Sequence, residues 1–203
     1  MANTKERILD SAEKLFAEHG IDGASLRAIT SAAEVNLGSI HYYFRTKEQL
    51  VAEVFNRRIE QYNQQGAAEF AELMEREKKP TLRELWLLLA NAMLSFRKQY
   101  PAFMRFMLQL QISREHLIMG KIAARNHVFE NDFLVAVTGC FPEASRYQVY
   151  VRSMIILNAF HRTALNYSVV LAYLQSGGIP ADDDLVAAHL ADVANASLQE
   201  YLA

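Results

Sequence analysis

The residues with the greatest potential for chemistry lie close together, between positions 25 and 47 of the chain. They offer hydroxyl, amide, imidazole and cationic groups, without a set of acid, base and nucleophile that would indicate catalysis. Groups of these kinds donate hydrogen bonds to phosphate oxygens. The segment therefore indicates binding of a phosphate backbone. The members of this set are Arg27, Asn36, Ser39, His41, Tyr42, Tyr43 and Lys47.

Two short helices joined by a tight turn would position these side chains. Ser25 is a good cap for a first helix, and Asn36 is a strong cap for a second helix over residues 37–44. Apolar residues fall where they can lock the two helices together; they are Leu26, Ile29, Val35, Ile40 and Phe44. In a helix-turn-helix the second helix enters the major groove of DNA. The pattern therefore predicts a DNA-reading element in which the small residues Gly38 and Ser39 let the backbone approach the duplex.

Several members of the set also have a purely structural interpretation. Asn36 caps its helix whether or not it touches a phosphate. Tyr42 and Tyr43 could be partly packed against the first helix of the chain, and His41 could be an ordinary surface residue. The sequence leaves these alternatives open beside DNA contact.

Arg27 and Lys47 also differ in how strongly their positions indicate DNA contact. Arg27 could form an ion pair with Asp22 or Glu34 instead of binding DNA. Lys47 follows the helix cap Thr46, so it lies beside free backbone N–H groups at a helix start, and such a site suits a phosphate.

The rest of the chain also has helical spacing of its apolar residues. A first helix is expected over residues 5–19, with Thr4 as its cap and Gly20 as its end. A long helix begins after Thr46 and extends toward residue 75, with a bend or break expected at Gly66. Further helices are expected over residues 81–98, from Pro101 onward, 114–138, 143–174, and from Asp182–Asp184 to about residue 202. The predicted fold class is all-α.

Composition narrows the functional classes. The 203 residues are 51% hydrophobic and carry a formal net charge of −2, so a globular protein is expected and charge alone does not indicate nucleic-acid binding. With Cys140 as its one cysteine the chain has no disulfide, and its apolar runs are too short for a membrane span. A cytoplasmic protein without membrane association, catalytic residues, metal site or cofactor is expected. A helical enzyme and a helical scaffold are the alternative functions, and neither explains the polar set at 25–47.

The residue sequence of the N-terminal segment strengthens the DNA-binding interpretation. The stretches LFAEHG (15–20), SLRAI (25–29), VNLGSIHYYF (35–44) and KEQL (47–50) resemble the TetR family of transcriptional regulators. The resemblance is specific over about residues 4–55. It implies a DNA-binding domain over residues 1–47 and a helical domain over 48–203 for effector binding and dimerisation. Val35–Leu37 with Tyr42, Phe44 and Lys47 looks most like members that include fatty-acid-responsive regulators.

The resemblance also implies which residues touch DNA. In the family, residues that match Ser25, Arg27, Asn36, Gly38, Ser39, Tyr42, Tyr43 and Lys47 commonly contact DNA, mostly its phosphates, and those at Leu37 and His41 often do. Two positions depart from the family pattern. Glu34 stands where glycine is usual, and a left-handed conformation there costs about 1–2 kcal/mol. His41 stands where tyrosine is usual, so both positions could alter the preferred operator.

A TetR-like body implies a ligand-responsive regulator, by family habit a repressor that a small effector releases from a palindromic operator. It also implies a homodimer through the last two helices. Residues 143–174 are apolar on nearly all sides and must be covered, which a partner subunit would do.

Two groups of residues are candidates for the effector site. The first is the large or soft apolar residues of the middle helices. Their abundance favours an apolar effector, although core packing is the more common role for any one of them. The second is a polar group formed by Asn158, His161, Arg162 and Asn166, which could anchor a headgroup, hold the structure together or contact the partner. Arg105 or Arg162 would suit a carboxylate. The predicted ligand-binding residues are Trp86, Phe103, Arg105, Met107, Asn158 and Arg162.

Overall fold

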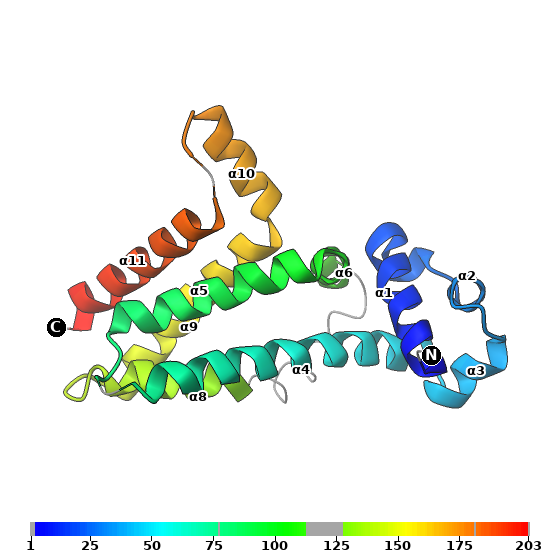
Figure 1. The fold of residues 1–203 in the computed structure, drawn as a ribbon, viewed down its shortest axis with the longest axis horizontal. Helices are drawn as coiled ribbons and strands as arrows, with labels where there is room; N and C mark the ends of the chain where they lie inside the picture. Colours follow the sequence, from blue (N-terminus) through cyan, green and yellow to red (C-terminus); the bar gives the residue numbers. More distant parts are fainter. Residues whose placement is uncertain (1–2, 77, 113–127, 181, 203) are drawn as a thin grey trace. The chain divides into compact units, whose positions relative to one another are not determined.

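The computed structural model of the chain describes residues 3–76, 78–112, 128–180 and 182–202, and within them it contains ten helices and no strand (Figure 1). The predicted all-α class is confirmed. The chain forms two compact units, residues 1–61 with 100–126 and residues 62–99 with 127–203. The helices are α1 (Thr4–Gly23), α2 (Leu26–Ala32), α3 (Leu37–Tyr43), α4 (Lys47–Met74), α5 (Leu82–Gln99), α6 (Pro101–Ile112), α8 (Val128–Gly139), α9 (Arg146–Leu165), α10 (Tyr167–Ser176) and α11 (Asp183–Leu202).

The first unit is built on the packing of α1 against α6. The ring of Phe16 stacks on that of Phe106 with centroids 5.8 Å apart, and Phe103 lies between Phe106 and Phe55 of α4. These rings are almost fully buried. The aromatic core therefore joins α1, the start of α4 and α6 into one body that carries α2 and α3.

The ends of α1 differ in detail from the prediction. Asn3 caps the helix instead of Thr4, because its side-chain oxygen accepts a hydrogen bond from the backbone N–H of Lys5 at 3.2 Å. Gly20 has a φ of 73°, so the regular helix ends there and one further helical turn continues to Gly23. Glycine adopts this conformation without the steric cost of a Cβ atom.

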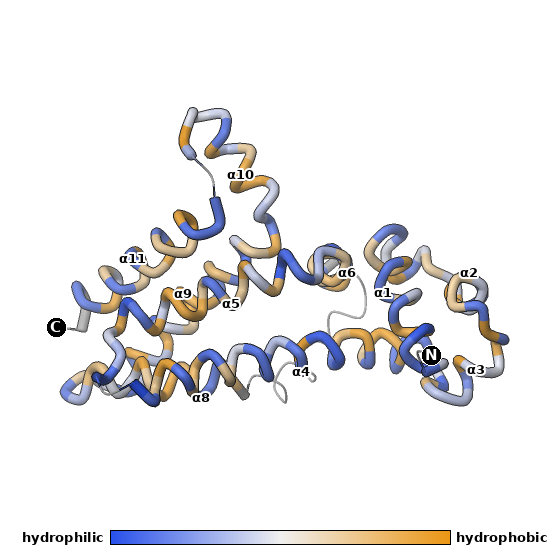
Figure 2. Tube along the Cα trace, in the orientation of Figure 1, coloured by the Kyte–Doolittle hydropathy of each residue, from blue (hydrophilic) through white to orange (hydrophobic). Residues whose placement is uncertain are grey.

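The second unit has an aromatic centre and a helix with small residues on its buried face. Trp86 of α5 lies 4.9 Å from the ring of Phe133 on α8 and 5.3 Å from that of Phe160 on α9, measured between ring centroids. Helix α11 packs along α5. Its fully buried positions are Ala187, Ala191, Ala194 and Leu198. Figure 2 shows the mixture of hydrophobic and hydrophilic residues along these amphipathic helices.

Two predicted boundaries in this unit are wrong. Helix α4 continues through Gly66 without the predicted break. Gly66 is buried, and an added Cβ atom would come within 2.5 Å of the Phe129 ring, so this glycine allows close packing within a continuous helix. The predicted helix over residues 143–174 is two helices that meet at Asn166. The Asn166 side chain donates to the carbonyl oxygen of Arg162 at 3.0 Å, in the local bonding that competes with helix continuation.

The remaining helices of the body follow the prediction closely. Pro101 opens α6, and α5 and α11 begin and end within about two residues of the expected positions. The Asp182 side chain accepts a hydrogen bond from the backbone N–H of Leu185 at the start of α11. Of the helix predicted over residues 114–138, the part before Val128 lies outside the described residues.

Candidate nucleic-acid interface

Helices α2 and α3 begin at the two predicted caps. The Ser25 hydroxyl oxygen accepts a hydrogen bond from the backbone N–H of Ala28 at 3.1 Å. The Asn36 side-chain oxygen accepts from both the backbone N–H and the hydroxyl of Ser39, at 2.9 and 3.1 Å. Each cap satisfies backbone donors that the first turn of a helix leaves unpaired. The caps thereby fix where both short helices begin and which faces they expose.

The two helices bury one side and expose the other. Ile29, Ile40 and Phe44 are at most 1% exposed, so they form the locked apolar face that the sequence predicts. On the exposed side, Tyr42 is 81% and Tyr43 37% accessible. The structure therefore leaves Tyr42 unpacked and Tyr43 partly packed. All ten predicted DNA-contact residues belong to the first compact unit and reach the surface. Ser39 and Lys47 are the least exposed of them.

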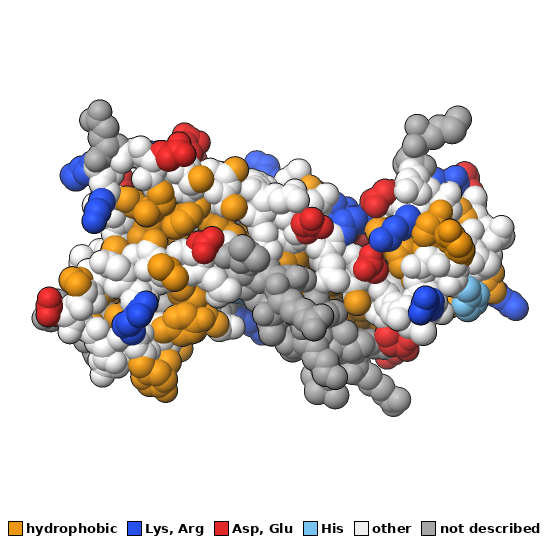
Figure 3. Space-filling view, turned by 90° about the horizontal axis from the view of Figure 1, so that it is seen from below, with side chains coloured by type: hydrophobic (Ala, Val, Ile, Leu, Met, Phe, Trp, Pro, Cys, Tyr) orange, Lys and Arg blue, Asp and Glu red, His pale blue; other side chains and the backbone are white. Residues whose placement is uncertain are grey.

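The exposed side of the motif brings together side chains that suit a nucleic acid. The rings of Tyr42 and Tyr43 meet edge to face with centroids 4.9 Å apart, so each stabilises the orientation of the other. At the right of Figure 3, where α2 and α3 lie, cationic, histidine and hydrophobic-coloured side chains share one surface, and tyrosine has the hydrophobic colour. Such a surface offers cations and hydroxyls for phosphates and flat rings for base edges.

The turn between α3 and α4 is tight. Arg45 has a φ of 60°, and the backbone N–H of Thr46 donates to the carbonyl oxygen of Phe44 at 2.6 Å. A non-glycine residue in this region is strained, and such strain is common at functional sites. His41 supports the turn, because its Nδ1 atom lies 3.3 Å from the Arg45 carbonyl oxygen. Since a carbonyl only accepts, Nδ1 carries the hydrogen and Nε2 is the nitrogen left for another partner.

The start of α4 is capped as predicted and already holds a carboxylate. The Thr46 hydroxyl accepts from the backbone N–H of Gln49 at 3.2 Å. Hydrogen bonds from the backbone N–H of Glu48 and from the Thr46 side chain lower the pKa of the Glu48 carboxyl. That carboxylate uses donors at the helix N-terminus that a phosphate would otherwise use. At the start of α4, the Lys47 side chain is therefore better placed to bind a phosphate than the backbone N–H groups are.

Glu34 adopts the left-handed conformation that its position in the family pattern implies, with a φ of 51°. Arg7 of α1 holds it there: one guanidinium nitrogen lies 3.2 Å from the Glu34 carbonyl oxygen and 2.9 Å from its carboxylate. The sequence suggested Arg27 as the partner of Glu34. Arg7 takes that role in the structure, and Arg27 is exposed. The Glu34 charge is thus balanced locally, which reduces its repulsion of DNA.

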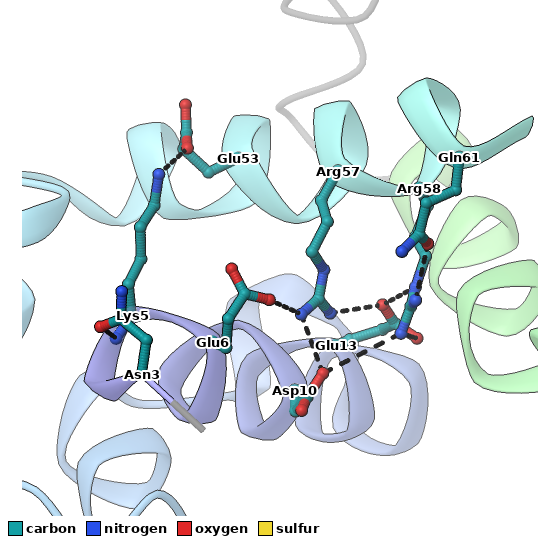
Figure 4. A network of polar contacts seen from close by, with 9 residues as sticks. All are labelled: Asn3, Lys5, Glu6, Asp10, Glu13, Glu53, Arg57, Arg58 and Gln61. Atoms are coloured by element: carbon teal, nitrogen blue, oxygen red, sulfur yellow. Dashed lines mark hydrogen bonds and ion pairs between the residues drawn. The ribbon is translucent and has the colours of Figure 1, made fainter. Parts of the chain in front are cut away.

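A network of ion pairs fastens α1 to α4 (Figure 4). Arg57 contacts three carboxylates of α1: Glu6 at 3.0 Å, Asp10 at 2.8 Å and Glu13 at 3.1 Å. The Nε atom of Arg58 lies 2.7 Å from the same Glu13, whose residue is only 4% exposed. Burial would lower the pKa of Arg57, but hydrogen bonds and charges from the carboxylates raise it above its ordinary value. The network holds α4 to α1, the helix against which α2 and α3 pack.

The predicted effector-binding residues divide between the two units. Phe103, Arg105 and Met107 belong to the first unit, where Phe103 packs in the aromatic core and Arg105 is exposed. Trp86, Asn158 and Arg162 belong to the second, where Trp86 is in the core and the other two are exposed.

Two members of the predicted polar group, Asn158 and His161, have partners within the same unit. Asn158 donates to the Met154 carbonyl oxygen of its own helix at 2.8 Å. His161 lies 3.0 Å from the carboxylate of Glu130 on α8, which is 3% exposed and was missed from the sequence. Burial raises the pKa of Tyr62 well above its usual range, and Glu130 adds to that effect. Among the described residues, no cluster of three or more His, Cys, Asp or Glu could hold a metal ion, and no helix is long and apolar enough to cross a membrane.

The family model of bacterial regulatory proteins of the tetR family matches residues 8–54, which contain most of α1, all of α2 and α3, and the start of α4. Over these N-terminal residues the chain is similar to the TetR family. The residues that carry the match are those that form the capped, one-sided motif described above. The DNA-binding motif of the TetR family is therefore present here in its sequence and in its fold.

Two curated transcriptional regulators are similar to this chain over part of its length. The probable HTH-type transcriptional regulator YttP of Bacillus subtilis is 42% identical over 57 residues, 26% of this chain and 28% of YttP. QacR of Staphylococcus aureus is 30% identical over 105 residues, 48% of this chain and 56% of QacR. The chain thus spans between about a quarter and somewhat over half of these relatives. The Bacillus subtilis regulator FadR, solved with stearoyl-CoA, has the same fold, with a TM-score of 0.67, 16% identity and coverage of 93% of this chain and 96% of FadR.

Proposed function

We propose that this chain is a transcriptional regulator that binds a palindromic DNA operator and is released from it by a small, largely apolar effector. One observation carries the proposal: α3 is capped by Asn36, buried on the side of Ile40 and Phe44, and exposed on the side of Tyr42. A helix exposed in this way can enter the major groove of DNA while its apolar side stays packed. The TetR-family motif supports the same assignment.

In the proposed complex, phosphates and bases are contacted by different residues. Ser25, Arg27, Asn36 and Lys47 contact phosphates from the helix starts and from α2, with Gly38 and Ser39 allowing the close approach. Leu37, His41, Tyr42 and Tyr43 face the groove. His41 presents Nε2, since Nδ1 is occupied by the Arg45 carbonyl oxygen. Phosphate contacts fix the position of the protein, and contacts to base edges select the sequence.

The regulator acts as a homodimer through α9 and α11. This proposal rests on apolar side chains that remain exposed on those helices in the single chain, including Tyr147 and Ile155 on α9 and Val193 on α11. Two recognition helices would then read half-sites about 34–36 Å apart, one turn of DNA. Residues 1–47 serve DNA binding and residues 48–203 serve effector binding and dimerisation.

Repression and release follow from a thermodynamic linkage. An effector that binds better to a conformation unsuited to DNA must weaken DNA binding, and DNA must weaken effector binding by the same factor. The predicted effector contacts are Trp86, Phe103, Arg105, Met107, Asn158 and Arg162. An acyl-CoA is the first effector to test, because FadR, which shares this fold, was solved with stearoyl-CoA.

The proposal is tested by titrating the full chain onto genomic DNA fragments at several salt concentrations. We expect selective binding whose affinity falls steeply as salt rises, since bound cations displace counterions from DNA. Lys47→Ala should weaken binding to all fragments and reduce the salt dependence, whereas Lys98→Ala, an exposed lysine of α5, should change neither. Protein refolded from denaturant, and so stripped of effector, that remains indifferent to DNA at every salt concentration would refute the proposal.

A further inference from the structure

Helix α10 is poorly covered by its own chain. Of its ten residues, Tyr167 is the buried one. Tyr173 is 75% exposed, Val169 and nearby Ile179 are each 51% exposed, and much of the helix has hydrophobic colours in Figure 2. Residues 163–181 contain no Asp, Glu, Lys, Arg or His. Helices that face water normally carry charged residues, and depletion of charge is typical of the core of an interface.

The base of this segment is fastened to α5. The Arg97 guanidinium lies 4.0 Å from the centre of the Tyr167 ring, at the start of α10. The same guanidinium contacts both carboxylate oxygens of Asp183, at the start of α11, at 3.1 Å. One side chain therefore holds both ends of the segment together. Between these ends, α10 rises away from α9 and α11 as an arm (Figure 1).

The arm needs a partner for energetic reasons. Isolated helices shorter than about 12–15 residues are marginal in water, and most helical stability in proteins comes from packing. The three exposed apolar side chains of the arm present roughly 300 Å², if a tyrosine contributes about 200 Å². A stable interface needs about 800 Å² from each partner, so the arm alone is too small to hold a separate protein.

Exposed apolar side chains also lie on α9 and α11, the helices before and after the arm. These side chains are Tyr147, Tyr150, Val151 and Ile155 on α9 and Val193 on α11. By the same reckoning they present roughly 500 Å², and with the arm the total reaches the size of a standard interface. Whatever covers α9 and α11 is therefore the best candidate to cover the arm. A chain that pairs with its own copy through these helices places two arms symmetrically about the dimer axis.

We propose that residues 168–180 form an arm that packs against a second copy of this chain, as an extension of the α9–α11 interface. This inference rests on the homodimer of the proposed function. The arm residues Val169, Tyr173 and Ile179 then bury their apolar surface on the partner, and Arg97 keeps the base of each arm in its own subunit.

A cross-linking experiment with the full chain tests the arm directly. Tyr173 is replaced by the photoreactive aromatic p-benzoylphenylalanine, in a mixture of chains labelled with ¹⁴N and ¹⁵N. We expect cross-links that join a light chain to a heavy chain, with the attached peptides on α9, α10 or α11. The same probe at Glu18, an exposed residue of α1, is the control and should give no such products. Cross-links within single chains only, or none above the control, overturn the proposal.

Sedimentation of charge variants separates the arm from the dimer itself. Tyr173→Asp should raise the dimer dissociation constant at least about tenfold, as removal of a buried interface aromatic does. Gln175→Asp on another side of α10 should leave it within about threefold. A dimer that Tyr173→Asp leaves unchanged overturns the arm and leaves the proposed function intact. Wild-type protein that is monomeric at all concentrations overturns the proposed homodimer and the arm with it. Far-ultraviolet circular dichroism checks that each variant is folded.

Discussion

Replacing Glu13 by glutamine should destabilise the protein more than any other single acid-to-amide change in the network between α1 and α4. Glu13 is 4% exposed and accepts hydrogen bonds from Arg57 at 3.1 Å and from Arg58 at 2.7 and 3.2 Å. Glutamine has nearly the same shape but no charge, and its NH₂ group cannot accept from an arginine. The variant therefore leaves two largely buried guanidinium groups short of one carboxylate.

The expected magnitude follows from burial and from the partners that remain. Breaking a fully buried ion pair by removing one partner costs about 3–5 kcal/mol. Here Arg57 keeps Glu6 and Asp10, and the Arg57 and Arg58 side chains are 13% and 14% exposed, so part of the cost is relieved. We expect a loss of about 2–3 kcal/mol in the free energy of unfolding, since hydrogen bonds to charged groups are worth somewhat more than neutral ones. For a chain of this length that corresponds to a fall in Tm of about 4–12 °C.

Thermal and urea unfolding of the variants measures the effect, with Asp10→Asn as the matched control. Asp10 contacts the same Arg57 at 2.8 Å, but its side chain is 55% exposed, so its loss should cost less than about 1 kcal/mol. The two variants remove the same charge from the same network and differ mainly in burial. If Glu13→Gln proves as stable as Asp10→Asn or more stable, burial does not determine how much each ion pair contributes to the free energy of unfolding.

Three further changes test other parts of the structure. Gly66→Ala should lower Tm despite the better helix propensity of alanine, because its Cβ atom would come within 2.5 Å of the Phe129 ring; a rise in Tm would contradict that close packing. Glu34→Gly should be more stable than Glu34→Ala by about 1 kcal/mol in urea unfolding, since both lose the exposed ion pair and only glycine relieves the left-handed strain; equal stabilities would argue against strain. Hydrogen bonds from the Thr81 hydroxyl and backbone N–H lower the pKa of Glu84, so its stabilising effect is present at neutral pH and is lost as pH falls and the carboxylate is protonated. The difference in Tm between wild type and Glu84→Gln should therefore shrink with acidification, and a difference that grows would reverse the assignment.

Local rules made much of the candidate site predictable from the sequence. The caps Ser25, Asn36 and Thr46 each bond to a backbone N–H three residues ahead, which is a short-range preference that residue type reveals. The burial of Ile40 and Phe44 follows from their spacing on one side of a helix. The DNA-binding segment could therefore be predicted without knowledge of the tertiary fold.

The contacts that the sequence did not reveal join residues far apart in the chain. Arg7 binds Glu34 across 27 positions, and Arg57 and Arg58 meet Glu13 across more than 40. Charged residues on helix surfaces have many possible partners, so their pairing depends on how the helices pack.

The errors in the body of the protein arise where one residue type permits two structures. Gly66 was expected to break α4, but glycine also allows close packing, and here it lies against Phe129. Asn166 ends α9 within an otherwise continuous apolar run, because its side chain bonds to the backbone of its own helix. The run of apolar residues around it gave no indication of that break.

Selection of bound sequences from random duplex DNA by the refolded, effector-free full chain tests the central claim most directly. We predict enrichment of a palindrome whose half-sites lie about 10 base pairs apart, centre to centre, as two copies of α3 one helical turn apart require. The Tyr42→Ala variant should change the enriched bases if Tyr42 contacts base edges, while Lys47→Ala should lower recovery without changing them. A selected pool that is indistinguishable from the starting DNA at low salt would contradict the assignment of α2 and α3 as a DNA-reading motif.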